Sequence, residues 1–79
     1  MELVVKFEPF VLQQTIFIKH TDGTIEQKDI PQKELASFIS LQENLSKVHF
    51  FGNKEFVSKV KEECLTKYKL KETIFCINC

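Results

Sequence analysis

Hydrophobic and polar residues alternate along the first part of the chain with the period of a β-strand. Every second residue of 3–7 is apolar, so one side of this run suits a core. The runs 14–20 and 24–30 flank Asp22-Gly23, a dipeptide that strongly favours a hairpin turn. The returning run is polar on both sides, which predicts an edge strand that resists pairing with other chains.

The second half of the chain alternates between helical and strand patterns. After Pro31, residues that are mostly apolar recur every three or four positions as far as Leu45, which predicts a first helix. Residues 47–51 have the composition of a short strand. Asn53 is a suitable N-cap for a second helix, predicted over residues 54–68.

The last predicted strand, residues 73–77, is almost entirely apolar, which fits a strand buried on both faces or nearly so. The element order is therefore βββαβαβ. Because crossovers between parallel strands are right-handed in about 98% of cases, we expect an α/β (α+β) fold with a mixed five-stranded sheet. Its expected strand order is 3-2-1-4-5, with two helices on one face and the other face uncovered. The residues expected to project from that uncovered face are Phe17, His49, Phe51, and Ile74 or Cys76.

Two interpretations of the uncovered face remain open. A contiguous apolar patch is seldom left exposed on a soluble monomer, so a second copy of the chain or another protein is expected to cover it. The alternative is that the connection formed by residues 9–13, including Phe10 and Val11, folds over the face.

Composition limits the classes of partner. With 79 residues, 43% hydrophobic and 28% charged, the chain suits one folded domain over residues 1–79. Its formal charge is zero and all eleven cations are lysines, so nucleic acid is not an expected partner. No run approaches the about 20 apolar residues of a membrane span, and residues 1–8 lack the pattern of a secretory signal. We therefore expect a cytoplasmic protein without a membrane partner.

The three cysteines, Cys64, Cys76 and Cys79, are an odd number in a chain without an export signal, which predicts reduced thiols and no structural disulfide. Cys76 and Cys79 have the spacing of a redox pair, but no helix follows them to lower a thiol pKa. Together with His20 or His49 the cysteines would complete a zinc ligand set. Incidental cysteines are the preferred interpretation, and no metal or cofactor is predicted.

Gly52-Asn53 stands between a strand and a helix, where backbone N–H groups at a helix N-terminus bind anions. Phosphate loops use several glycines at fixed spacing, so a turn and a helix cap is the preferred interpretation. A small ligand, if one binds, is expected at Gly52 and Asn53 with Glu34, beyond the carboxyl end of the strand.

The order of elements, from the Asp22-Gly23 hairpin to the strand end at residues 48–53, resembles the core of the ribonuclease H-like fold. That resemblance implies carboxylates on the first strand, the first helix and the end of the fourth strand, which hold two divalent metals in the nucleases. The matching positions are Val5, Glu34 and Asn53. Only one of these is a carboxylate, so no catalytic residue is assigned. Residues 48–56 are also similar to small uncharacterised proteins of bacteria and their phages.

Together these patterns favour a small non-enzymatic protein-interaction module, self-associating through its uncovered sheet face, as an accessory protein of a bacterium or phage. The expected partner is a second copy in a homodimer, or another protein. One alternative is a small-ligand or anion-binding domain, with or without catalysis, at the Gly52-Asn53 turn. The other is a zinc-stabilised adaptor that uses Cys64, Cys76 and Cys79.

Overall fold

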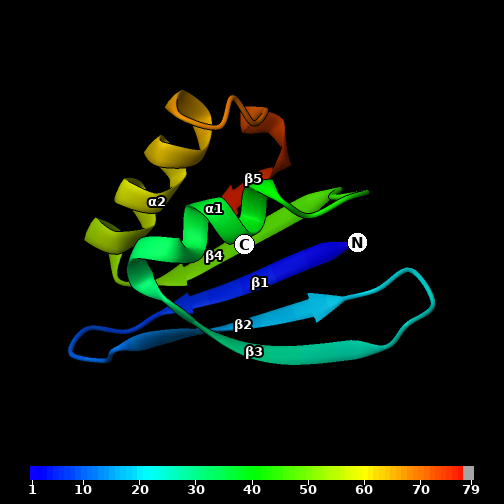
Figure 1. The fold of residues 1–79 in the computed structure, drawn as a ribbon, viewed down its shortest axis with the longest axis horizontal. Coiled ribbons are helices and arrows are strands. Elements are labelled where there is room, and N and C mark those ends of the chain that lie inside the picture. The colour runs from blue at the N-terminus through cyan, green and yellow to red at the C-terminus, as the bar shows by residue number, and fades with distance from the viewer. Residues whose placement is uncertain (78–79) are drawn as a thin grey trace.

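Five strands form one mixed sheet, and both helices lie on the same side of it (Figure 1). The computed structural model describes residues 1–77. Its elements are β1 (Glu2–Phe7), β2 (Gln13–Lys19), β3 (Ile25–Pro31), the 3-10 helix η1 (Gln32–Glu34), α1 (Leu35–Ser40), β4 (Lys47–Gly52), α2 (Lys54–Thr66), the 3-10 helix η2 (Glu72–Ile74) and β5 (Phe75–Ile77). The strand order is β3-β2-β1-β4-β5, which confirms the predicted topology and fold class.

The sheet combines two antiparallel and two parallel contacts. β1 pairs antiparallel with β2, which pairs antiparallel with β3. On its other side β1 runs parallel to β4, and β4 runs parallel to β5. The hairpin half of the chain and the helical half therefore meet where β1 pairs with β4.

The hydrophobic core lies between the sheet and the helices. Alternate residues of β1, β2 and β4 point into it, because side chains along a strand project to opposite faces. The rings of Phe7 and Phe50 meet edge to face with centroids 5.2 Å apart, and Phe75 lies 5.5 Å from Phe50. The buried cluster consists of Leu3, Val5, Phe7, Ile16, Ile18, Leu35, Ala36, Ile39, Val48, Phe50, Val57, Val60 and Cys64.

Gly52 permits a close approach between the ends of β1 and β4. Its φ of 101° lies in the left-handed region, and a Cβ added there would stand 2.2 Å from the carbonyl oxygen of Phe7. That same carbonyl accepts a hydrogen bond from the N–H of Asn53 at 3.0 Å. Only glycine fits this position without moving the backbone of β1.

The helix α1 is shorter than the sequence pattern predicts. It ends at Ser40 and not near Leu45, and Asn44 takes a φ of 57° in the turn that follows. The side-chain nitrogen of Gln42 donates to the carbonyl oxygen of Phe38 at 2.9 Å, which satisfies a helix-end acceptor. Leu45 still packs against the core, but from a loop. The apolar spacing therefore continued beyond the helix itself.

The helix α2 and the β2–β3 hairpin agree with their sequence signals. The side-chain oxygen of Asn53 accepts the N–H of Phe56 at 3.1 Å, so the predicted N-cap is confirmed. At the other end Lys69 has a φ of 59°, and the helix closes at Thr66, before the predicted residue 68. In the hairpin Gly23 has a φ of 93°. Among the described residues, no helix has both the length and the apolar character to cross a membrane.

The strand β5 is a short edge strand, and the prediction that both its faces are buried is wrong. Residues 72–74 form η2, and only Phe75–Ile77 pair with β4. These residues are partly buried or exposed, because the strand order leaves β5 with a single neighbour. The polar strand β3 forms the opposite edge, as predicted.

Replacement of Gly52 by alanine is expected to lower the free energy of unfolding by roughly 2 kcal/mol or more, because the left-handed backbone is strained and the new Cβ meets β1. Gly23→Ala is the matched control. Gly23 also has a positive φ, but nothing lies within 4 Å of its added Cβ, so a loss of about 1 kcal/mol is expected. Urea unfolding measures both variants, and equal losses would contradict the importance of the close approach.

Candidate functional site

The face of the sheet opposite the helices carries a stripe of mostly apolar side chains. In the strand register Phe17, Val4, His49 and Cys76 lie side by side across four strands. Phe51 projects from the same face, two residues beyond His49 on β4. We call these five residues the sheet-face stripe. The structure thus places Phe17, His49, Phe51 and Cys76 on the face where they were expected.

Charged rows flank the sheet-face stripe on both sides. One row places Glu2 between Lys19 and Lys47, and the other contains Lys6 and Asp29 on either side of Thr15. Cations and anions alternate along these rows. The two rows therefore carry charges of both signs.

Within the stripe, His49 is paired with an acid. Its Nε2 atom lies 2.9 Å from the Oε1 atom of Glu2, and both side chains are partly exposed. This hydrogen bond lowers the pKa of Glu2 below its ordinary value of 4.5. Pairing with Glu2 gives the Nε2 atom of His49 a hydrogen-bonding partner where the imidazole lies beside Val4.

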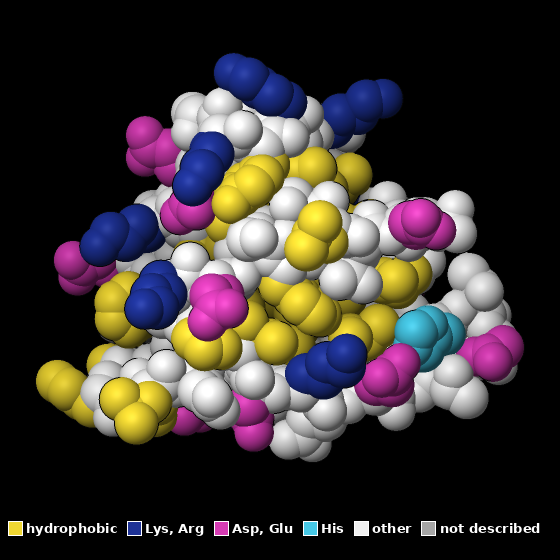
Figure 2. All heavy atoms as spheres, in the orientation of Figure 1, with side chains coloured by type: hydrophobic (Ala, Val, Ile, Leu, Met, Phe, Trp, Pro, Cys, Tyr) yellow, Lys and Arg dark blue, Asp and Glu magenta, His cyan; other side chains and the backbone are white. Residues whose placement is uncertain are grey.

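The β1–β2 connection projects from the end of the sheet and does not cover the open face. Phe10 and Leu12 have relative exposures of 103% and 93%, and Val11 is also exposed. Figure 2 shows hydrophobic side chains protruding at the lower left, where Figure 1 places this connection. The alternative in which residues 9–13 fold over the face is therefore wrong.

Gln14 holds the base of this connection. Its side chain is only 2% exposed, and it is the one buried polar side chain among the described residues. Its Oε1 atom accepts the N–H of Glu8 at 2.8 Å, while its Nε2 atom donates to the carbonyl oxygen of Glu8 at 2.8 Å and to Oε1 of Gln32 at 3.0 Å. A buried amide is stable only when its hydrogen bonds are made. We call the three hydrogen bonds of Gln14 the clamp, and they fix where the connection leaves the sheet.

Sequence reasoning missed Gln14 because a polar residue in a strand is ordinarily assigned to the solvent side. Its position was nevertheless a signal, since it lies two residues from Ile16 and four from Ile18, both buried. A glutamine at a core position of a strand needs a nearby hydrogen-bonding partner. The backbone of Glu8 and the side chain of Gln32 supply it.

Phe10 is strained as well as exposed. Its φ is 63°, in the left-handed region that large side chains rarely adopt, which costs on the order of 1–3 kcal/mol. The ring of Phe10 is exposed to solvent, so no packing contact within the described chain offsets this strain energy. Strained, exposed apolar residues occur often where proteins bind other molecules, so the connection is a candidate binding element.

Two of the three residues predicted for a small ligand, Gly52 and Asn53, form the turn before α2. The N–H of Asn53 donates to Phe7 and its side chain caps α2, so both groups serve the turn. Glu34 is exposed in η1 and lines a hollow with Phe38 and Leu41, whose lining does not include Gly52 or Asn53. The geometry of this region is that of a turn and a helix cap.

The cysteines do not form one cluster. Cys64 is buried in the core on the helix side of the sheet, and burial raises the pKa of its thiol to about 12. Cys76 pairs with His49 in the register and so faces the opposite side. Cys79 lies outside the described residues. In the described range 1–77, no three His, Cys, Asp or Glu residues are grouped to hold a metal.

Two expectations for the end of the chain need correction or refinement. Cys76 is disulfide-bonded, so the prediction of reduced thiols is wrong for this residue. Cysteine count and the lack of a signal indicate a compartment, but not whether two sulfur atoms lie within bonding distance. Ile74 lies in η2 and packs against the core, so Cys76 is the residue that β5 contributes to the open face.

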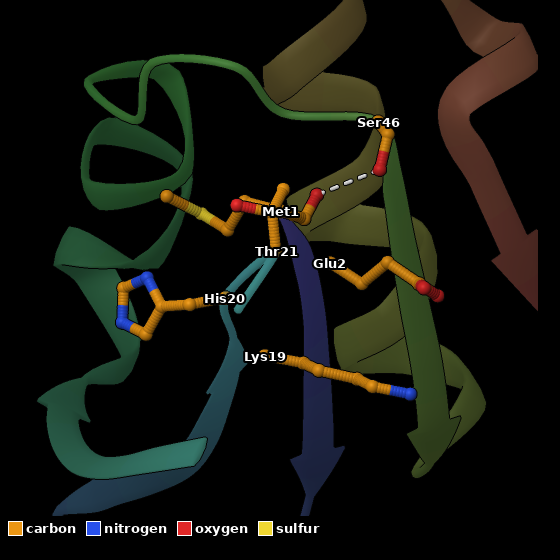
Figure 3. Close-up of a pocket in the computed structure, with 6 residues that line it drawn as sticks. All are labelled: Met1, Glu2, Lys19, His20, Thr21 and Ser46. Carbon is orange, nitrogen blue, oxygen red and sulfur yellow. Dashed lines mark hydrogen bonds between the residues drawn. The ribbon is translucent and has the colours of Figure 1, made fainter. Parts of the chain in front are cut away.

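A polar hollow of about 220 Å³ lies at the opposite end of the sheet from the β1–β2 connection (Figure 3). Its lining consists of Met1, Glu2, Lys19, His20, Thr21 and Ser46. The side chains of Glu2 and Lys19 extend toward β4, whereas the His20 ring points to the other side (Figure 3). The charged groups diverge, so this hollow offers no common point at which they would hold a ligand.

Replacement of Gln14 by leucine should still fill the buried position, with an apolar side chain of similar size. It should leave the N–H and carbonyl of Glu8 without their hydrogen-bonding partner. We expect the free energy of unfolding to fall by about 1–3 kcal/mol and the amide of Glu8 to exchange its hydrogen faster. Gln13→Leu, at the exposed neighbouring position, is the control and should change neither quantity. Unaltered exchange at Glu8 in the Gln14 variant would argue against the clamp.

The hydrogen bond between Glu2 and His49 predicts a pH dependence. A carboxyl whose pKa is lowered on folding contributes stability above its ordinary value of 4.5, and loses that contribution as the pH falls through the lowered folded value. In a carbon-detected NMR titration, Glu2 should therefore titrate below 4.5. The variant His49→Gln should move its midpoint back upward, and an unmoved midpoint would show that another group sets it.

No family model, no curated protein and no solved structure matches this chain. The resemblance to the ribonuclease H-like fold consequently stays an expectation that rests on the order of elements. The candidate binding surfaces on the described residues are thus defined by their physical properties alone. They are the sheet-face stripe and the exposed β1–β2 connection.

Proposed function

We propose that this chain is a small non-enzymatic protein-interaction module that associates with a second copy through the open face of its sheet. The observation that carries the proposal is the sheet-face stripe, which crosses four strands and includes Phe17 at 37% exposure. Both helices lie on the other face, and the β1–β2 connection projects away from it.

The size of the face supports a weak, concentration-dependent pair. Four strands have six or seven residues and β5 has three. Each rises about 3.3 Å per residue, and neighbouring strands lie about 4.8 Å apart. The face therefore measures on the order of 500 Å², so a pair would bury roughly 1,000 Å² in total. That is the low end of specific interfaces, where association responds to protein concentration.

The alternating charges support a homodimer over a charged partner. The rows beside the stripe contain both signs, and the whole chain has a formal net charge of zero. Two identical faces therefore avoid the repulsion that a face of a single sign would create. We further propose that the pair acts as a cytoplasmic accessory protein of a bacterium or phage.

We expect the mass measured by sedimentation or light scattering to rise with concentration from the 9.3 kDa monomer toward the dimer. Phe51→Asp and Phe17→Asp should each raise the apparent dissociation constant roughly tenfold or more, because a charge would be buried in an apolar contact. Ser58→Asp, which adds the same charge on an exposed position of α2, is the control. A wild-type chain that stays monomeric at high concentration, or variants that associate like the wild type, would refute the sheet-face proposal.

A further inference from the structure

Two exposed apolar features lie next to each other at one end of the molecule, apart from the sheet-face stripe. The first is the loop tip, formed by Phe10, Val11 and Leu12. The second is a shallow hollow between β3 and α1, which we call the helix-edge hollow. It is lined by Ile30, Pro31, Glu34, Ser37, Phe38 and Leu41.

The backbone of the loop tip is constrained in the isolated chain. Gln14 fixes the base of the connection through both backbone groups of Glu8. Phe10 follows Pro9, whose ring restricts the backbone, and takes a left-handed φ of 63°. A convex apolar element that is already ordered loses little conformational entropy when it docks, so its burial contributes directly to affinity.

The helix-edge hollow has the size and lining to accept an aromatic ring. It measures about 180 Å³, and its walls are mostly apolar. An apolar cavity of about 150 Å³ is large enough to bind benzene. Leu41 stands at its rim with 75% exposure, and the ring of Phe38 has the ammonium group of Lys28 5.8 Å from its centroid. Figure 2 shows hydrophobic side chains in the band between α1 and β3.

The strand register places the loop tip beside the hollow. Gln13, the residue after Leu12, pairs with Pro31, which lines the hollow. The Gln14–Gln32 hydrogen bond joins the same two segments. The loop tip does not fill the hollow of its own chain, because Phe10 and Leu12 are fully exposed.

We propose that Phe10 of one copy occupies the helix-edge hollow of a second copy, while the Phe10 of that copy occupies the hollow of the first. A convex element and its receptor that lie side by side on one surface make such a contact self-complementary about a two-fold axis. By itself, this reciprocal contact closes into a pair. It shares with the proposed function the premise that the partner is a second copy, but it uses a different surface.

The reciprocal contact buries the same apolar side chains in both copies of the pair. A docked phenylalanine removes roughly 150–250 Å² from water, and the two-fold axis doubles the contribution of Phe10, Leu12 and Leu41. Burial of Phe10 against Phe38 also brings two aromatic rings together near Lys28. The strain at Phe10 is then offset by a contact that the isolated chain does not make.

The test uses the Phe51→Asp background, in which the sheet-face contact is disrupted. In this background we expect residual, concentration-dependent association by sedimentation. Adding Phe10→Ser removes the element that docks, and adding Leu41→Lys instead blocks the hollow. Each should raise the apparent dissociation constant roughly tenfold or more. Both positions are exposed, so the folded monomer should be retained.

Mixing the two variants provides a rescue that a structural defect would not produce. The Phe10→Ser chain keeps its hollow and the Leu41→Lys chain keeps its loop tip, so a mixed pair retains one of the two contacts. Association should therefore be stronger in the mixture than in either variant alone. A mixture that associates no more strongly than either variant alone would overturn the reciprocal contact.

A photo-crosslinking benzophenone side chain at position 10 identifies what the loop tip touches. In a mixture of isotope-labelled and unlabelled chains, crosslinks between copies should map to α1 near Phe38 and Leu41. Crosslinks to Phe17 or Val4 would instead place the loop tip on the sheet of the second copy and overturn the proposal. A Phe51→Asp chain that stays monomeric at every concentration would overturn it while leaving the sheet-face dimer intact.

Discussion

The parallel pairing of β1 with β4 is the contact on which the other parts of this structure depend. β1 belongs to the hairpin half of the chain, and β4 lies between the two helices, so their ladder joins the halves. The ladder ends where the carbonyl of Phe7 accepts the N–H of Asn53, an approach that Gly52 permits because it has no Cβ. Asn53 then caps α2, so the same junction also determines where that helix begins.

One-sided cover of the sheet follows from this pairing. Right-handed crossovers on either side of β4 bring α1 and α2 to the same face, and the buried cluster gathers there. The other face keeps the sheet-face stripe, a flat surface flanked by charges of both signs. The loop tip is a different kind of surface, since it is convex, strained at Phe10 and held by the buried amide of Gln14. The two surfaces suit different contacts, one between flat faces and one between a loop tip and a hollow.

Local patterns predicted most of the fold and part of the candidate site. Strand alternation placed Phe17, His49 and Phe51 on one face, because side-chain direction in a strand depends only on position. Local patterns did not predict the hydrogen bonds of Gln14. The burial of Gln14 depends on Glu8 and Gln32, which lie next to it only in the folded chain. Local patterns also did not predict that the loop tip is exposed to solvent, because the sequence of an apolar tripeptide does not indicate whether another segment covers it.

The sequence by itself determined the order and type of the elements, the Asp22-Gly23 hairpin and the cap at Asn53, because turn chemistry and periodicity act between near neighbours. Only the tertiary structure decided that α1 stops at Ser40 while Leu45 packs from a loop, and that β5 is a partly exposed edge. It also decided that Phe10 projects beyond the sheet. Burial depends on which segments meet in space, and that information is distributed over the whole chain.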